Sequence, residues 1–221
     1  IVPTALEECD DDYDGIVSYF DLSQKNDEVL NGQTGIVVSY HESIEDAENN
    51  TNGIVDLYTN TNADTQTLHV RLEDNETGCA ATTTLELVIN PIPEVIIPPV
   101  LELCDANYDG ITTMDLSSLD TTILNGQTGI TITYYETQED ADNATNVLAI
   151  EYQNSNPNTQ ELIVRLEDDV TGCYSTTTQG IIVNVPGVIE VTDYEQCDYT
   201  NPGDLIEVFD ITTKDSEIIN G

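Results

Sequence analysis

The sequence has no tryptophan, one methionine and only four basic residues. Because 43 acidic residues oppose those four, the formal net charge is −39, and almost nothing in the chain could neutralise phosphate groups. Nucleic acids and anionic membrane surfaces are therefore excluded as partners. No apolar run approaches the roughly 18 residues that a membrane span needs, so we expect no direct membrane insertion. No charged and apolar leader opens the chain, and we expect any secretion signal to lie outside this segment.

Internal repetition dominates what is present. Three short strings, GQTGI, VRLED and TGC, each occur twice at a spacing of 94 residues: Gly32–Ile36 and Gly126–Ile130, Val70–Asp74 and Val164–Asp168, Thr77–Cys79 and Thr171–Cys173. Such a period is too long for one turn of a solenoid and suits a string of small domains. We therefore expect two complete repeats at residues 1–93 and 94–187, and the start of a truncated third repeat at 188–221. Proline-rich joints are expected between them, one at residues 90–99 and one at Val185–Gly187.

Within each repeat the pattern predicts an all-β fold. Segments such as Ile36–Tyr40 and Ile130–Tyr135 alternate apolar and polar residues, as half-buried strands do. A long strand then runs into a turn, at Asp74–Gly78 or Asp168–Gly172, and returns as a Thr-rich strand. We expect tandem immunoglobulin-like β-sandwiches of about seven strands each. Short helical turns are expected after Ser43 and Thr137, in a capping-box spacing, and around Ser117–Ile123.

Acidic loops follow the first cysteine of both complete repeats. They read D-x-[DN]-x-D-G, which resembles the first half of an EF-hand loop, where spaced oxygens bind calcium and glycine permits the sharp bend. Oxygen ligands without His or Cys favour Ca²⁺ over zinc or iron. The alternative is an Asx-rich turn without an ion, and the third repeat departs from the pattern. The predicted ligands are Asp10, Asp12, Asp14, Ile16 (through its carbonyl) and Asp21 in the first repeat, and Asp105, Asn107, Asp109, Ile111 and Asp115 in the second.

The five cysteines fall into two classes, one before each acidic loop and one after each hairpin turn. Their regular recurrence predicts disulfides and an oxidising compartment. Two pairings are open. Pairing within repeats gives Cys9–Cys79 and Cys104–Cys173, and pairing across the joints gives Cys79–Cys104 and Cys173–Cys197. We favour the first, because the last hairpin of a sandwich is expected to return to the end where the chain entered.

No residue pattern predicts catalysis. The two histidines, His41 and His69, have Tyr135 and Ile163 as their counterparts in the second repeat, so neither recurs. Neither a nucleophile elbow nor a phosphate-binding glycine loop is present. We therefore expect that this segment is not an enzyme.

One family resemblance is carried by L-C-D-x-N-x-D-G, ILNGQTGITITYYETQEDAD, VRLED and TGCYSTTT, all in Leu103–Asn184. This order resembles the tandem repeats of giant flavobacterial cell-surface proteins of the adhesin and gliding-motility type, the group that includes SprB. The resemblance implies export by the type IX secretion system, a surface filament on a Gram-negative cell, and a role in adhesion or gliding.

Together these observations favour a structural, calcium-stabilised repeat segment of a secreted cell-surface adhesin or extracellular filament. Its partners would be neighbouring repeats of the same chain, and surface glycans, other cell-surface proteins or further copies in a fibre. The alternatives are a calcium-dependent glycan- or protein-binding module, for which Tyr13 and Tyr108 recur beside the loops, and an accessory domain of a secreted hydrolase.

Overall fold

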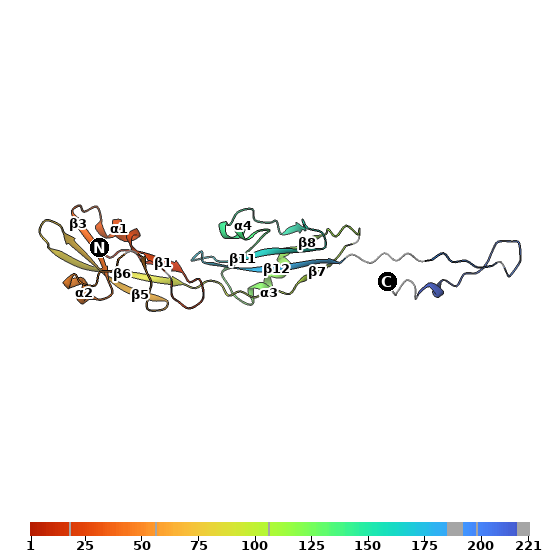
Figure 1. Ribbon diagram of the computed structural model, residues 1–221, viewed down its shortest axis with the longest axis horizontal. Coiled ribbons are helices and arrows are strands. Elements are labelled where there is room, and N and C mark those ends of the chain that lie inside the picture. The colour runs from red at the N-terminus through yellow and green to blue at the C-terminus, as the bar shows by residue number, and fades with distance from the viewer. Residues whose placement is uncertain (18, 56, 106, 185–191, 198, 216–221) are drawn as a thin grey trace. The chain divides into compact units, whose positions relative to one another are not determined.

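The first repeat contains six strands and three short helices (Figure 1). The computed structural model describes residues 1–17, 19–55, 57–105, 107–184, 192–197 and 199–215. In the first repeat the elements are β1 (Leu6–Cys9), β2 (Phe20–Asp21), η1 (Leu22–Lys25), α1 (Asn26–Leu30), β3 (Ile36–His41), α2 (Ile44–Asn49), β4 (Leu57–Tyr58), β5 (Thr65–Asp74) and β6 (Ala80–Asn90).

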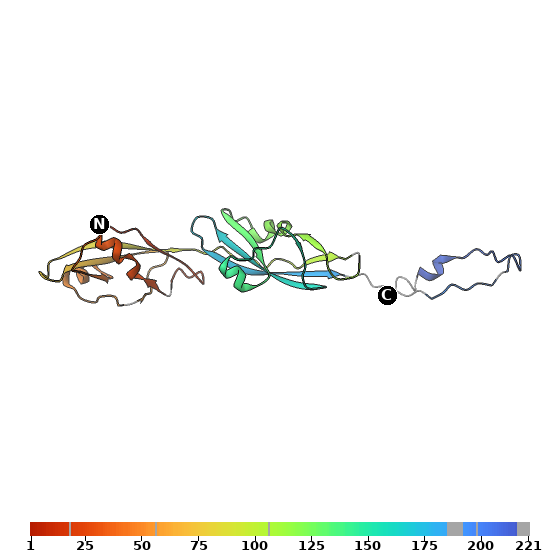
Figure 2. The same cartoon turned by 90° about the horizontal axis from the view of Figure 1, so that it is seen from above.

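The second repeat follows the same order of elements. These are β7 (Leu101–Cys104), β8 (Thr113–Asp115), η2 (Leu116–Leu119), α3 (Asp120–Leu124), β9 (Ile130–Tyr135), α4 (Gln138–Asn143), β10 (Glu151–Gln153), β11 (Thr159–Asp168) and β12 (Tyr174–Asn184). Figure 2 shows the first repeat coloured from red to yellow and the second from green to blue.

Each repeat contains a four-stranded and a two-stranded sheet. The strand orders are β1-β6-β5-β3 with β2-β4, and β7-β12-β11-β9 with β10-β8. The first strand of each repeat runs parallel to the last, whereas the long hairpin strands are antiparallel. The prediction of tandem, sandwich-like all-β repeats is confirmed, with six strands in the described part of each repeat where about seven were expected.

The core of the first repeat lies between its two sheets. Phe20 and Tyr58 of the small sheet pack in one buried cluster with Leu68, Leu85 and Leu87 of the large one. Alternation along β5 and β6 produces this, because side chains two residues apart share a face of a strand. The equivalent residues of the second repeat are buried as well. Four of them are apolar, namely Met114, Tyr152, Leu162 and Ile181, and the fifth is Gln179, which stands in the place of Leu85.

Both expected capped helices are present. The hydroxyl of Ser43 accepts a hydrogen bond from the backbone N of Asp46 at 3.1 Å, and that of Thr137 accepts one from Asp140 N at 3.1 Å. Side-chain acceptors at these positions satisfy backbone donors that a first helical turn leaves unpaired. The helical turn expected around Ser117–Ile123 is formed by η2 and α3.

By its internal contacts the chain divides into two compact units. The first comprises Ile1–Pro98, Leu116–Ala149 and Leu162–Thr178, and the second comprises Pro99–Asp115, Ile150–Glu161 and Gln179–Gly221. The described residues beyond 191 contain one 3₁₀ helix, η3 (Ile211–Lys214), and no strand. The joint at Val185–Gly187 and parts of the third repeat fall outside the described residues. None of the helices in the described part of the chain is long and apolar enough to span a membrane.

Candidate functional site

The first acidic loop is organised by Asp10, which follows β1 directly. Its backbone N donates to Asn90 O at 2.8 Å, which extends the parallel pairing of β1 with β6. Its carboxylate then accepts three backbone hydrogen bonds, from Asp12 N at 3.2 Å, Tyr13 N at 3.1 Å and Gly15 N at 3.0 Å. Asp10 is only 5% exposed, so this carboxylate forms the inner wall of the loop.

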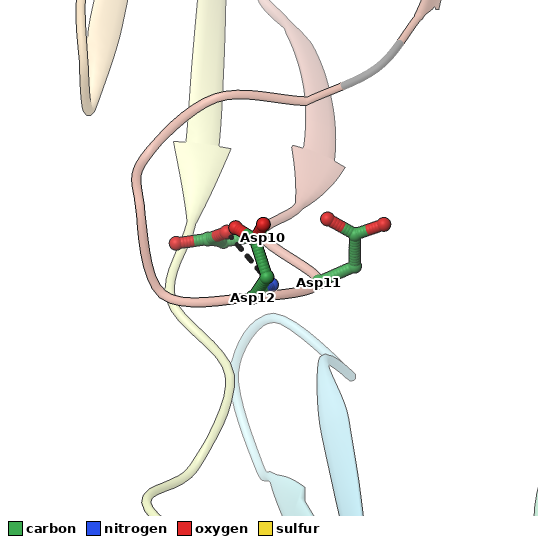
Figure 3. A group of neighbouring side chains, drawn as sticks. All are labelled: Asp10, Asp11 and Asp12. Atoms are coloured by element: carbon green, nitrogen blue, oxygen red, sulfur yellow. Dashed lines mark hydrogen bonds between the residues drawn. The ribbon is translucent and has the colours of Figure 1, made fainter.

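Further carboxylates crowd the same loop. Asp12 accepts from Asp14 N at 3.3 Å, and Asp14 accepts from Ile16 N at 2.7 Å. Ligand oxygens of Asp10, Asp11 and Asp12 all lie within 4.8 Å of one another (Figure 3). Desolvation raises the pKa of Asp12 above its ordinary value, and the neighbouring charges of Asp14 and Asp11 raise it further. This crowding of like charges is the arrangement that a divalent cation relieves.

The second loop has the same frame but fewer charges. Asp105 is 3% exposed and accepts from Asn107 N at 2.9 Å and Gly110 N at 2.7 Å. These backbone donors, Asn107 N first, hold the pKa of Asp105 below its ordinary value. Asn107 stands where the first loop has Asp12, and its Nδ2 donates to Asp109 Oδ2 at 2.9 Å. The second loop therefore satisfies one of its own carboxylates with an amide.

A buried asparagine clamps each loop from the far side. Asn60, 2% exposed, accepts from Val17 N at 2.7 Å and donates to the carbonyl of Gly15 at 2.8 Å. Asn154, also 2% exposed, accepts from Thr112 N at 2.7 Å and donates to Gly110 O at 2.9 Å. The sequence alone did not single out this asparagine, although it recurs at the 94-residue spacing as Asn60 and Asn154.

The glycine of each loop is required by conformation and by space. Gly15 has φ +76°, and a Cβ there would lie 2.7 Å from Cβ of Ala63. Gly110 has φ +75°, and a Cβ would lie 2.6 Å from Oδ1 of Asn158. L-residues with a side chain rarely adopt such φ values, and here they would also clash.

The structure brings together only some of the predicted metal ligands. Asp10 and Asp12 form an acidic group with Asp11, which the prediction did not include. Asp21 lies outside this group and caps η1, accepting from Ser23 N at 3.1 Å and Ser23 Oγ at 2.6 Å. Asp115 is the last residue of β8, paired with Glu151. The donor set of both loops is all oxygen, which fits Ca²⁺.

A disulfide joins Cys9 to Cys173, with a Cα–Cα distance of 5.6 Å. The favoured pairing, Cys9–Cys79 with Cys104–Cys173, is therefore wrong, and so is the rival bond Cys173–Cys197. Because β1 is parallel to β6, Cys9 lies opposite Asn90 at the end of β6, whereas Cys79 precedes its start. These 11 residues of strand separate the two cysteines of the repeat by roughly 36 Å.

The disulfide lies within the first compact unit, together with two polar contacts to the joint. Tyr13 Oη donates to Pro93 O at 2.8 Å, and Ser175 Oγ donates to the same carbonyl at 2.7 Å. Cys173 is 1% exposed. Bond and contacts thus tie the end of β1 and the start of β12 to the proline joint.

A family model matches residues 5–93 and 100–186, described as the Flavobacterium inter-domain disulphide bond domain. The chain belongs to this family. It contains two copies of the inter-domain disulphide bond domain, and the Cys9–Cys173 bond is a disulfide between them. A disulfide of this kind is typical of secreted and extracellular chains. No curated protein sequence matches the chain.

Similarity to solved structures adds nothing to this assignment. A chimeric titin Z1Z2 tandem is 13% identical over 69% of this chain and 86% of its own, with a TM-score of 0.24. Drosophila N-cadherin EC1-3 is 15% identical over 69% of this chain and 57% of its own, with a TM-score of 0.22. An endo-fucoidan hydrolase of glycoside hydrolase family 107 is 14% identical over 84% of this chain and 28% of its own, with a TM-score of 0.21. TM-scores this low support no argument about fold or function.

Proposed function

We propose that this chain is a structural, calcium-stabilised segment of a secreted cell-surface adhesin or extracellular filament, without enzymatic activity. The observation that carries the proposal is the Cys9–Cys173 bond. A covalent bond between consecutive repeats suits an array that carries mechanical load, whereas simple tethering does not need such a bond. The resemblance to flavobacterial adhesin and gliding-motility repeats of the SprB type adds support for export by the type IX system.

Calcium would act at the two acidic loops. In the first, Asp10, Asp12 and Asp14 with the Ile16 carbonyl would hold the ion, and in the second, Asp105, Asn107 and Asp109 with the Ile111 carbonyl. Bound Ca²⁺ would neutralise clustered charge in a chain of net charge −39. The hydrogen bonds that fix Asp10 and Asp105 would keep each loop preformed for the ion.

Thermal unfolding of the whole chain tests the calcium role. An ion present at 100 times its Kd stabilises the folded state by about 2.7 kcal/mol. We expect Ca²⁺ to raise Tm relative to EDTA, and Mg²⁺ to raise it less. The variant D14N should lose part of the rise, whereas D27N, with the same charge change in α1, should keep it. Equal Tm values in Ca²⁺ and EDTA would refute the calcium role.

A second candidate is a calcium-dependent module that binds glycans or proteins. Tyr13 and Tyr108 favour this binding role, because they are 53% and 54% exposed. Their backbone φ angles are +68° and +67°, an uncommon conformation that is repeated at both loops. Y108A should abolish glycan-array binding if this reading holds. Absence of any bound glycan or surface protein for the unmodified chain would leave the structural role alone.

A further inference from the structure

The strand β3 forms one edge of the large sheet in the first repeat, in the order β1-β6-β5-β3. Backbone N–H and C=O groups of an antiparallel strand point to its two sides at alternate residues. Tyr40 O accepts from Ile54 N at 2.8 Å, on the side away from β5. The backbone groups of Ile36 and Val38 therefore point to the same free side, and none of the described residues bonds to them there.

The two edges of this sheet differ in charge. The other edge strand, β1, carries Glu7 and Glu8, and charges on an edge strand oppose pairing with another chain. The sequence of β3 is Ile-Val-Val-Ser-Tyr-His, which contains none of the 43 acidic residues of the chain. The β3 edge therefore lacks the protection that the β1 edge has, and it is open to one more strand.

A hollow of about 450 Å³ lies beside the β3 edge. Apolar and aromatic side chains from β3, η1, β4 and the segment before β4 form its walls, namely Val38, Tyr40, Leu22, Leu57 and Ile54. Leu57 is 56% exposed, and Glu151 stands in its place in the second repeat. At this position the apolar wall is therefore a property of the first repeat.

One negative charge and no positive charge line the hollow. The charge belongs to Asp21, which accepts from Ser23 N and Ser23 Oγ through Oδ1, so that no described residue bonds to Oδ2. Burial, and then the negative charge of Asp21, raise the pKa of Tyr40 to about 12. The carboxylate therefore acts inside the hollow, and a cation would complement it.

Apolar walls around one carboxylate suit a long cationic side chain. The methylene groups of lysine or arginine pack on apolar surface while the charged head reaches a carboxylate. A free strand edge, in turn, binds an extended peptide through its backbone groups. The two features together favour an extended segment that carries basic residues.

We propose that β3 binds an extended basic segment of another protein, which adds to the large sheet at Val38 and inserts a lysine or arginine side chain into the hollow beside Asp21. Charge complementarity supports this partner, because the chain has a net charge of −39. The site does not include the acidic loops or the disulfide, so this inference and the proposed calcium and load-carrying roles fail independently.

A second copy of this chain does not supply such a segment. Its four basic residues are Lys25, Arg71, Arg165 and Lys214, and no two of them lie in one strand. Three of the four are already in ion pairs with glutamates of the same repeat. The partner is therefore a different protein.

Calorimetric titration of the whole chain in EDTA tests the proposal, with a seven-residue peptide of alternating threonine and lysine as the probe. A matched peptide has 2,4-diaminobutyrate in place of lysine, with the same charge and a stem shorter by two methylene groups. We expect it to bind about tenfold more weakly, because less apolar surface is buried in the hollow. A peptide with acetyl-lysine keeps the stem, loses the charge and should not bind.

Three variants address the three parts of the site. D21N removes the charge, L57T removes part of the apolar wall, and V38P removes the edge N–H, which the sheet itself does not use. Each should weaken binding, whereas E45Q, with the same charge change as D21N but in α2, should leave it unchanged. Hydrogen exchange should show new protection at the Val38 amide when the lysine peptide binds. Circular dichroism would check that each variant is folded.

Several outcomes would overturn the proposal. Equal affinity for the lysine and diaminobutyrate peptides, or equal losses in D21N and E45Q, would show that net charge alone attracts the probe. New protection outside Ile36–Tyr40 would place the peptide elsewhere. Self-association of the chain that V38P abolishes would show that a second copy occupies the edge.

Discussion

The two repeats have the same elements in the same order, yet they differ at chosen places. The asparagine clamp is identical, with Asn60 and Asn154 making matching bonds at both loops. Asp12 in the first loop becomes the neutral Asn107 in the second. Leu85, fully buried in β6, becomes the equally buried Gln179 in β12. The fold thus keeps the residue that shapes the loop and tolerates change in loop charge and in one core position.

Removal of the clamp is expected to have the largest effect. N60A or N154A would leave buried backbone groups of one loop without partners, and we expect each to destabilise its repeat by about 3 kcal/mol. Hydrogen exchange with mass spectrometry would report the two repeats separately. N62A, at an exposed neighbouring asparagine, is the matched control and should change little. Unequal losses of stability in N60A and N154A would show that the two repeats are not equivalent.

The next largest effect is expected at the core position that is Leu85 in the first repeat and Gln179 in the second. Gln179 Nε2 donates to Pro99 O at 3.0 Å and Gly180 O at 2.7 Å, but its buried Oε1 has no partner among the described residues. Q179L should therefore stabilise the second repeat by about 1 kcal/mol, because an unsatisfied acceptor is removed and apolar surface is added. Calorimetry would measure it, and L85Q should change the first repeat in the opposite direction. A loss of stability in Q179L would mean that the bond to Pro99 outweighs the unpaired oxygen.

The loop charges are expected to set how strongly each repeat responds to calcium. D12N gives the first loop the residue of the second, and N107D makes the reverse exchange. We expect D12N to raise Tm in EDTA and to diminish the calcium-induced rise, and N107D to do the opposite, because removal of a carboxylate relieves repulsion and also removes a ligand charge. Identical calcium responses in both variants and the parent would contradict this.

The smallest expected effect is a difference in pKa between an aspartate of the first loop, Asp12, and one of the second, Asp105. Asp105 has a lowered pKa, so the stability it contributes is complete above the unfolded value of about 3.9 and is lost as pH falls through its folded pKa. Asp12 has a raised pKa, so its charge opposes folding at neutral pH and its protonation on acidification relieves that repulsion. Carbon-detected NMR titration without calcium should show Asp12 protonating first. The reverse order would contradict the difference between the loops.

Much of the fold could be predicted from the sequence, because its signals are local. Alternation of apolar and polar residues predicted the hairpin strands. The two capped helices were predicted from Ser43 and Thr137, each of which has an aspartate three residues later. The cysteine pairing could not be predicted, since it depends on β1 running parallel to β6, which places Cys9 and Cys79 at opposite ends of one strand. The Asn60 clamp was missed because a buried asparagine in a polar loop has no local pattern, although its recurrence as Asn154 was visible.

The Cys9–Cys173 bond also has a mechanical consequence. A pull on the two ends of the chain passes through the sulfur atoms and bypasses the 164-residue separation between the cysteines. While the bond is intact, roughly 550 Å of contour length in those residues cannot be extended, even if both repeats unfold. Extension under tension would then be limited by the redox state of one bond, so that a reducing environment, and not force alone, would decide how far this segment stretches.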